Sequence, residues 1–327
     1  MRLPLIAAIL LAAASTPAFA LKILVVNDDG LTSNLKALHA ALKNAGHDVI
    51  VSVPCTGQSG RGAAVVMYSS GRIVADNDKT QIDAEAGCHN GAAPLGAPAV
   101  GPFTKAGFTN GDFYYAHGTP VAATMYGLDV LAPQRWKAPP DLVLSGPNEG
   151  QNLGRLVNSS GTVGNAQFAA ARGLPSIALS AASQSRDDRE LNNPQSPIIA
   201  ALTLKLVAAL QASAGRGPLL PAGIALNVNF PDTPRTDLGW ALTRHGTTDP
   251  YEIHFNDTPP YGPRFARVDV QPSAAQAQDE GVVYRTKITV TPMQQGFDVA
   301  SATSAALGTK LRALLAPAAK TAASSTP

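Results

Sequence analysis

The sequence lacks an excess of charge of either sign. Its 327 residues include 25 Lys and Arg against 23 Asp and Glu. Proteins that bind nucleic acid usually carry a basic stripe, and those that bind acidic membrane surfaces carry a polybasic cluster. Neither pattern is present here. The composition therefore argues against a nucleic acid duplex and against a membrane as partners.

Cysteine is scarce, with only Cys55 and Cys88. Neither lies in a CxxC motif or near a pair of histidines, so the sequence predicts no zinc site. In an oxidising compartment two cysteines tend to form a disulfide. A Cys55–Cys88 disulfide and two separate buried thiols both stay open on the sequence alone.

Long apolar runs are also lacking after the first twenty residues, so no later segment is expected to span a membrane. Residues 1–20 themselves show a positive start, a short apolar stretch and the small-x-small triplet Ala18-Phe19-Ala20. This pattern is typical of a secretory signal peptide cleaved after Ala20, although a buried N-terminal helix is an alternative. We therefore expect an exported, periplasmic protein.

The first part of the remaining chain alternates between strand-like and helix-like segments. Short apolar runs predict buried strands, and apolar residues at helical spacing predict helices between them. Such an order is typical of an α/β protein with a Rossmann-like, doubly wound, mostly parallel sheet. The predicted strands are 23–27, 48–53, 141–145, 176–180 and 223–230, and the predicted helices are 33–45, 119–131, 162–172 and one from 196 onward.

Composition changes along the chain predict four regions. After the signal peptide, residues 21–231 form the catalytic domain, interrupted by a Gly-, Ala- and Pro-rich stretch at 84–111 that is interpreted as a long surface loop. Residues 232–316 form a smaller β-rich extension for oligomerisation, with an exposed-face strand at 282–292 and a last helix at 304–315. Residues 317–327 are of low complexity and predict a disordered tail.

Polar residues follow three of the predicted strands. Asp28 and Asp29 end the first, Ser59 lies in the loop after the second, and Asn148 lies in the loop after the third. Because the carboxyl ends of parallel strands meet at one edge of the sheet, these side chains are expected to converge. An all-oxygen set suits Mg²⁺, Mn²⁺ or Ca²⁺. A plain turn, with Asp capping the next helix, is the alternative for the acidic pair.

A second motif suits an anion. Ser160, Gly161 and Thr162 precede a predicted helix, whose free backbone N–H groups favour phosphate. The side chain of Asn148 or Asn152 would add donors. A simple Ser/Thr helix cap is the alternative reading of this motif.

These motifs occur together in a specific order: "VNDDG", the Ser59-Gly60 pair, "GTP", "SGPNEGQNLG", "SSGTVGNA" and "LNVNFP". In this the chain resembles the SurE family of metal-dependent nucleotidases and acid phosphatases. The resemblance implies one divalent cation per subunit, Mg²⁺ or Mn²⁺, on Asp28, Asp29, Ser59 and Asn148. It also implies hydrolysis of phosphomonoesters, chiefly nucleoside monophosphates, by a homodimer or homotetramer.

The mechanism expected from these residues is metal-assisted attack by water, with Asp28 or Asp29 orienting the water or taking its proton. Two other classes are weighed against it. One is a secreted ligand-binding protein without turnover, since one fold can host both. The other is an esterase with Ser59 as nucleophile, but "GQSGR" is not the GxSxG motif of such enzymes.

Overall fold

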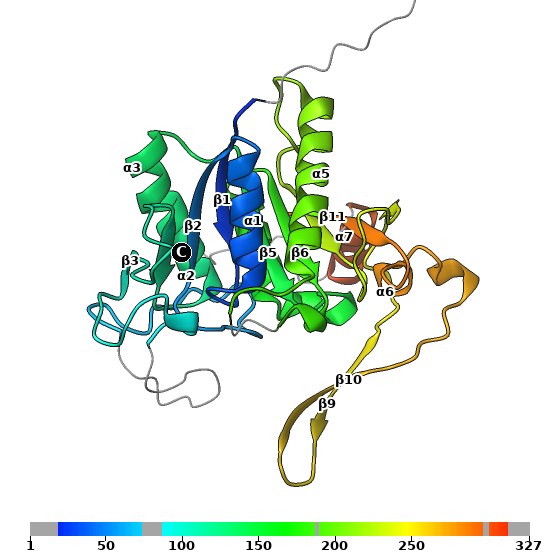
Figure 1. The fold of residues 1–327 in the computed structure, drawn as a ribbon. Helices are drawn as coiled ribbons and strands as arrows, with labels where there is room; N and C mark the ends of the chain where they lie inside the picture. Colours follow the sequence, from blue (N-terminus) through cyan, green and yellow to red (C-terminus); the bar gives the residue numbers. More distant parts are fainter. Residues whose placement is uncertain (1–18, 74–86, 187–189, 297–300, 313–327) are drawn as a thin grey trace, which may run out of the picture. The chain divides into compact units, whose positions relative to one another are not determined.

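Nine strands form the main sheet of the structure, a computed structural model that describes residues 19–73, 87–186, 190–296 and 301–312 (Figure 1). Their order across the sheet is β3-β4-β2-β1-β5-β6-β7-β11-β8. Neighbouring strands are parallel except at β3–β4 and β7–β11. The strands are β1 Lys22–Val26, β2 Asp48–Pro54, β3 Val100–Pro102, β4 Phe113–Ala116, β5 Leu142–Glu149, β6 Ser176–Ala181, β7 Ile224–Asn229, β8 Trp240–Leu242 and β11 Ile288–Gln294.

Helices cover both faces of this sheet, as the predicted Rossmann-like fold requires, and that prediction is confirmed. Side chains of β1 alternate: Ile23 and Val25 lie in the core with α1 and α5, while Leu24 and Val26 lie in a second cluster on the other side. Figure 1 shows α1 and α5 together in front of the strands. The helices are α1 Ser33–Asn44, α2 Pro120–Tyr126, α3 Ala132–Trp136, α4 Gly161–Ala171, α5 Ser196–Ala214 and α6 Glu280–Val283, and a π-helical segment, 127–131, joins α2 to α3.

The sequence favours Ser33 and Thr119 as the N-caps of α1 and α2, and the structure differs from this in detail at both helix starts. The cap of α1 is Thr32 rather than Ser33, because the Thr32 hydroxyl accepts a hydrogen bond from the Leu35 N–H. Thr119 does precede α2 as predicted, but its hydroxyl donates to the Ala64 carbonyl at 2.6 Å and accepts from the Val66 N–H. That hydroxyl therefore binds residues 64–66 to the start of α2 instead of capping the helix.

The stretch predicted as a surface loop at 84–111 is partly buried where the structure describes it, from residue 87. Cys88, Phe103 and Phe108 are buried, and the two phenylalanines lie against Phe113 of β4. The segment is thus largely irregular and partly exposed, as predicted, but several of its side chains belong to the core. Its weak periodicity has a physical cause: the segment adds one short strand, β3, to the sheet edge and otherwise packs through isolated side chains.

The predicted strand at 282–292 is also corrected. Its first residues belong to α6 and the turn after it, and β11 begins only at Ile288. β11 lies between β7 and β8 inside the main sheet, where Ile288 and Thr289 are buried. It is therefore an interior strand, not an exposed-face strand of a separate extension.

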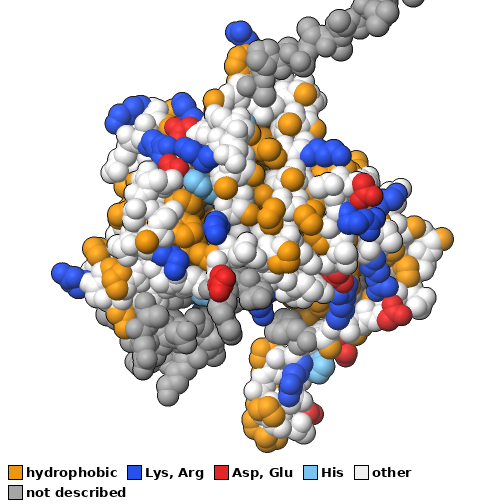
Figure 2. Space-filling model, viewed as in Figure 1, with side chains coloured by type: hydrophobic (Ala, Val, Ile, Leu, Met, Phe, Trp, Pro, Cys, Tyr) orange, Lys and Arg blue, Asp and Glu red, His pale blue; other side chains and the backbone are white. Residues whose placement is uncertain are grey.

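A second sheet consists of the antiparallel hairpin of β9 Tyr251–Asn256 and β10 Gly262–Arg267. The side chains of Phe255 and Tyr261 are 68% and 69% exposed, and that of Ile253 is 40% exposed. Figure 2 shows hydrophobic side chains gathered on this hairpin. The sequence predicted only turns and scattered aromatics here.

Several predicted regions are not decided by the fold. A compact unit extends to Gln295, and Gly296–Pro327 form a second unit that contains α7 Ser301–Lys310. The boundary at residue 231 stays a prediction, although β8 and β11 beyond it join the main sheet. The signal peptide lies outside the described residues except for its last two, and the tail at 317–327 lies wholly outside them.

Helix α5 corrects one expectation about membranes. Among the described residues, α5 is the one helix that is both long enough and apolar enough to cross a bilayer, with a mean hydropathy of 1.6. Core helices pass the same test, and Ile199, Leu202 and Val207 of α5 lie in the core shared with α1.

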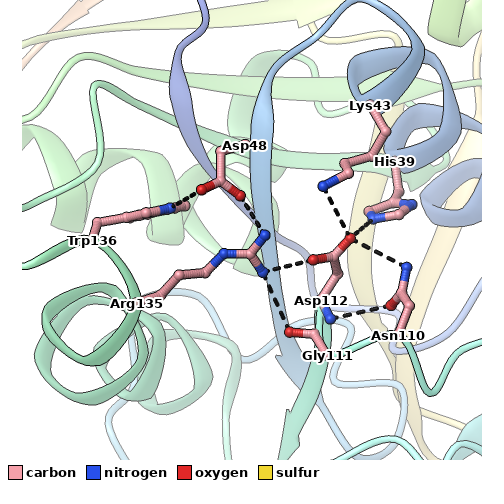
Figure 3. Close-up of polar contacts among 8 residues, drawn as sticks. All are labelled: His39, Lys43, Asp48, Asn110, Gly111, Asp112, Arg135 and Trp136. Carbon is pink, nitrogen blue, oxygen red and sulfur yellow. Dashed lines mark hydrogen bonds and ion pairs between the residues drawn. The ribbon is translucent and has the colours of Figure 1, made fainter.

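The amino ends of β2 and β4 carry an ionic network (Figure 3). Arg135 of α3 bridges two carboxylates, since it donates to Asp112 at 2.6 Å and also pairs with Asp48. Asp112 further contacts the His39 Nε2 atom at 2.9 Å and the Lys43 Nζ atom at 3.4 Å. Each strand start is thus fixed by a carboxylate whose charge is balanced by the protein's own cations.

Candidate active site

The acidic pair follows β1 in a tight turn built by Asn27. The Asn27 side chain donates to the Gly30 carbonyl at 2.7 Å and accepts from the Gly30 N–H at 3.0 Å. Gly30 has φ = 83°, a conformation that residues with a side chain rarely adopt. The turn therefore leaves Asp28 and Asp29 at the carboxyl edge of the sheet.

Asp28 is a buried carboxylate with neutral donors. The residue is only 3% exposed, and the Thr162 hydroxyl donates a hydrogen bond to its Oδ1 atom at 2.5 Å. Burial raises the pKa of Asp28, and the bond from Thr162 offsets only part of that effect. A desolvated carboxylate in such a place gains most from a cation supplied from outside.

The N-terminus of α4 is packed directly on Asp28. A Cβ atom placed on Gly161 would lie 2.7 Å from the Asp28 Cβ and 2.8 Å from the Pro120 Cγ, which is closer than real atoms approach. Ser160 caps the helix by accepting from the Val163 N–H at 3.1 Å. The predicted anion motif and the predicted cation site are therefore adjacent.

The two other loops reach the same edge. The Glu149 N–H, at the end of β5, donates to the Asp29 Oδ2 at 3.2 Å. The Gln58 N–H donates to the Asp28 carbonyl at 2.7 Å, and this places the exposed Ser59, the next residue, in the loop over Asp28. The roles of Ser59 and of both carboxylates as metal ligands stay predictions.

The two asparagines of the β5 loop lie in different environments. Asn148 is half-buried and its side-chain amide donates to the Gly150 carbonyl at 2.7 Å. Asn152 is buried, and its amide donates to the Ser180 hydroxyl at 2.9 Å. Asn152 is thus held as part of the loop's support, while its predicted contact with substrate stays untested.

The structure adds a polar residue that the sequence reasoning did not assign. Asn165 of α4 is fully buried and donates to the Asn27 carbonyl at 3.2 Å and to the Ser145 hydroxyl at 3.3 Å. It joins α4 to the ends of β1 and β5. Its position inside the quoted "SSGTVGNA" motif was the available signal, because a buried asparagine three residues past the anion motif needs hydrogen-bond partners.

The Cys55–Cys88 disulfide is confirmed. Cys55 follows β2 directly, and its carbonyl accepts from the His89 N–H at 2.7 Å. His89 in turn lies beside Gly30, since a Cβ on Gly30 would be 3.2 Å from the His89 Cβ. The disulfide therefore fixes residues 88–89 against the turn that carries the acidic pair.

The donor chemistry fits a hard divalent cation. Among the described residues, no group of three or more His, Cys, Asp or Glu side chains gathers as a metal site. Two carboxylates, one hydroxyl and one amide remain as the oxygen donors of the candidate set, and Asp28 is desolvated. Mg²⁺ and Mn²⁺ accept such sets, with water or phosphate oxygens completing them.

Fold and site together define an α/β protein with an oxygen-rich acidic site at the carboxyl edge of a mostly parallel sheet, beside a helix N-terminus suited to an anion. Residues 23–252 match the protein family described as Survival protein SurE. The chain belongs to the SurE family.

Named relatives support this assignment. The chain is 30% identical over 284 residues to a 5'/3'-nucleotidase SurE of Yersinia enterocolitica, which covers 84% of this chain and 91% of the relative. It is 35% identical over 219 residues to an acid phosphatase of Yarrowia lipolytica, covering 64% of this chain and only 56% of that protein. The crystal structure of SurE from Aquifex aeolicus matches with a TM-score of 0.60 and 26% identity, over 89% of this chain and 99% of that one.

Proposed function

We propose that the protein is a divalent-metal-dependent phosphomonoesterase that hydrolyses nucleoside monophosphates to nucleoside and phosphate. One observation carries the proposal: Asp28, a buried carboxylate, lies in contact with the N-terminus of α4. A carboxylate and a phosphate bound beside it repel each other unless a cation lies between them. The names of the relatives, 5'/3'-nucleotidase SurE and acid phosphatase, point to the same reaction.

The cation would be held by Asp28, Asp29, Ser59 and Asn148, with Mg²⁺ and Mn²⁺ as the candidates. When bound, it supplies positive charge next to the phosphate oxygens and makes water more acidic. Metal dependence is a general property of this family, and the choice of metal is part of the proposal.

The chain's own residues perform the remaining work. Backbone N–H groups near Ser160–Thr162 and the side chain of Asn148 or Asn152 bind phosphate oxygens where negative charge increases. The N–H groups of Gly161 and Thr162 also act on the Asp28 carboxylate. The Thr162 hydroxyl fixes the Asp28 carboxylate at 2.5 Å, so that it cannot rotate freely. Asp28 or Asp29 orients the attacking water and accepts its proton.

Assembly and location complete the proposal. The hairpin β9–β10 exposes Ile253, Phe255 and Tyr261, and exposed apolar groups of this kind are typical of contact surfaces. We propose that it contributes to a homodimer or homotetramer, and that the mature protein, beginning at Leu21, is exported to the periplasm.

The test uses the purified mature protein with a panel of nucleoside monophosphates and other phosphomonoesters. Phosphate release is measured after complete chelation and again after Mg²⁺ or Mn²⁺ is restored. We expect loss with the chelator and recovery with at least one metal, with nucleoside monophosphates the best substrates. Activity that survives chelation would contradict the metal site, and absence of release from any phosphomonoester would favour the ligand-binding alternative.

A further inference from the structure

The loop after β5 connects Asn148 to the turn at 154–158 through the sequence "EGQNLG". Gly154, its last residue, has φ = 55°. A loop with glycine at such a position has few steric limits of its own, so its conformation depends on contacts from elsewhere in the chain. Those contacts come from the C-terminal part of the molecule.

Glu280, the first residue of α6, supplies one of them from inside the protein. Its side chain is fully buried, and each carboxylate oxygen has two contacts. Oε1 accepts from the Gly154 N–H at 3.3 Å and contacts the His245 Nδ1 at 2.7 Å. Oε2 accepts from the Asn227 amide at 3.1 Å and from the Thr291 hydroxyl at 2.7 Å.

Asn227 extends this contact to the middle of the loop. Its side-chain amide also donates to the Asn152 carbonyl at 2.9 Å. Asn229, two residues along β7, donates to the same carbonyl at 3.1 Å and accepts from the Asn152 N–H at 2.8 Å. The Gly154 N–H is thus bound to Glu280 directly, and the Asn152 carbonyl is linked to it through Asn227. The Asn152 N–H is held separately, by Asn229.

A buried carboxylate is a poor choice for stability alone, because apolar side chains of the same volume often stabilise as well. We propose that Glu280 is a positioning residue of the active site, which holds residues 152–154 so that Asn148 and Asn152 face the substrate. The expected loss of activity rests on the proposed function, whereas the expected loosening of residues 152–154 does not.

Replacement by glutamine tests the geometry at constant volume. Glutamine offers one acceptor oxygen where four donors converge, so at least one of the donors to residue 280 meets an amide group instead. We expect Glu280→Gln to lower kcat/KM for a nucleoside monophosphate about tenfold or more, the range found when groups supporting a metal site are lost. Thr291→Val removes one donor and should lower kcat/KM only about threefold.

Thr248→Val is the matched control. Thr248 is buried in the same C-terminal region, and its hydroxyl donates to Asp279 at 2.9 Å rather than to Glu280 or to the loop. This variant should lower the melting temperature at least as much as Thr291→Val, while kcat and KM stay within about twofold of the parent protein.

Hydrogen exchange of the amides at 149–154 gives a readout independent of catalysis. We expect faster exchange there in Glu280→Gln than in the parent, with α1 unchanged. Parent-like kinetics and parent-like exchange in Glu280→Gln would overturn the inference, as would an equal kinetic loss in Thr248→Val. If the parent hydrolyses no phosphomonoester, the proposed function fails, but the exchange result still decides whether Glu280 holds the loop. If Glu280→Gln does not fold, the Thr291→Val and Thr248→Val pair decides by the same criteria.

Discussion

Buried carboxylates at the two ends of the main sheet have pKa values shifted in opposite directions. At the amino end, Asp112 contacts Arg135, Lys43 and His39, and its pKa is lowered: burial alone would raise it, but bonds from Arg135 and His39 outweigh that effect (Figure 3). At the carboxyl end, the donors to the Asp28 carboxylate are neutral, namely the Thr162 hydroxyl and backbone N–H groups, and burial outweighs them and raises the pKa.

The difference is the one expected between a structural carboxylate, Asp112, and a carboxylate that we propose binds a cation, Asp28. A charge that the chain neutralises itself contributes to stability, whereas a desolvated charge with neutral donors costs stability and attracts a ligand of opposite sign. Asp112 and Asp28 occupy equivalent places at opposite strand ends, so replacing each by asparagine should produce opposite effects.

The largest effect is expected on activity at the carboxyl end. Asp28→Asn should lower kcat/KM by about 10³-fold, because several kcal/mol of charge stabilisation are lost. Asparagine keeps an oxygen for the Thr162 bond, so the fold should persist, and circular dichroism checks this. Full activity in the folded variant would refute the site assignment.

The next effect is on stability at the amino end. Asp112→Asn should reduce the free energy of unfolding by about 2–4 kcal/mol, because Arg135 and Lys43 lose a buried partner. Denaturant unfolding measures it, with kcat/KM expected within twofold of the parent. The control is Asp141→Asn. Asp141 is an exposed carboxylate at the same end of the sheet, and it accepts a hydrogen bond from the Lys22 N–H at 2.8 Å. Its replacement should change the free energy of unfolding by about 0.5 kcal/mol or less. Equal losses in both variants would remove the distinction.

A smaller effect of opposite sign is expected for Asp28→Asn in chelator at pH 7. Removing a desolvated charge should raise the melting temperature by about 2–4 °C, corresponding to about 1 kcal/mol. Calorimetry of the metal-free proteins measures the shift. A decrease comparable to that of Asp112→Asn would mean that Asp28 is a structural carboxylate.

The smallest effect is a pH dependence carried by two histidines near the amino end. Burial lowers the pKa of His39, outweighing Asp112, and also that of His47, whose Nδ1 accepts from the Leu21 N–H. Below their ordinary value of 6.5, the unfolded chain binds protons that the folded protein does not, so stability falls as pH decreases. The lowered pKa of Asp112 adds a further loss below about 3.8.

Denaturant unfolding at pH 7 and pH 5 measures this dependence. The double variant His39→Gln/His47→Gln should lose less stability between these pH values than the parent does. An unchanged loss would assign the pH dependence to other groups.

Much of the fold could be predicted because β1, β2 and β6 are mostly apolar and β5 and β7 begin with apolar runs. Such runs have few alternatives to a covered parallel sheet. The convergence of Asp28, the Ser59 loop and the β5 loop at one edge followed from that order. Glu149 and Gln58 give the contacts that join these loops. The sequence placed the acidic pair correctly relative to α4, although their catalytic roles await the variants above.

The rest depends on contacts between distant segments, which local pattern does not carry. Glu280 and Thr291 look like an ordinary surface acid and a strand residue, and only folding brings both to Asn227. Phe103 and Phe108 pack without periodicity, so the insertion looked like a loop. The amino-end network is similar: Asp48, Asp112 and Arg135 are separated by more than twenty residues each, and nothing in their spacing indicates a shared contact.

The close approach of Gly161 to Asp28 has a consequence for the distance between α4 and the turn after β1. Because a methyl group at residue 161 would meet both Asp28 and Pro120, this distance can be kept only without a side chain at that position. Any larger residue requires α4, Asp28 or Pro120 to move. Residue 161 therefore sets how closely the helix N-terminus can approach the carboxylate.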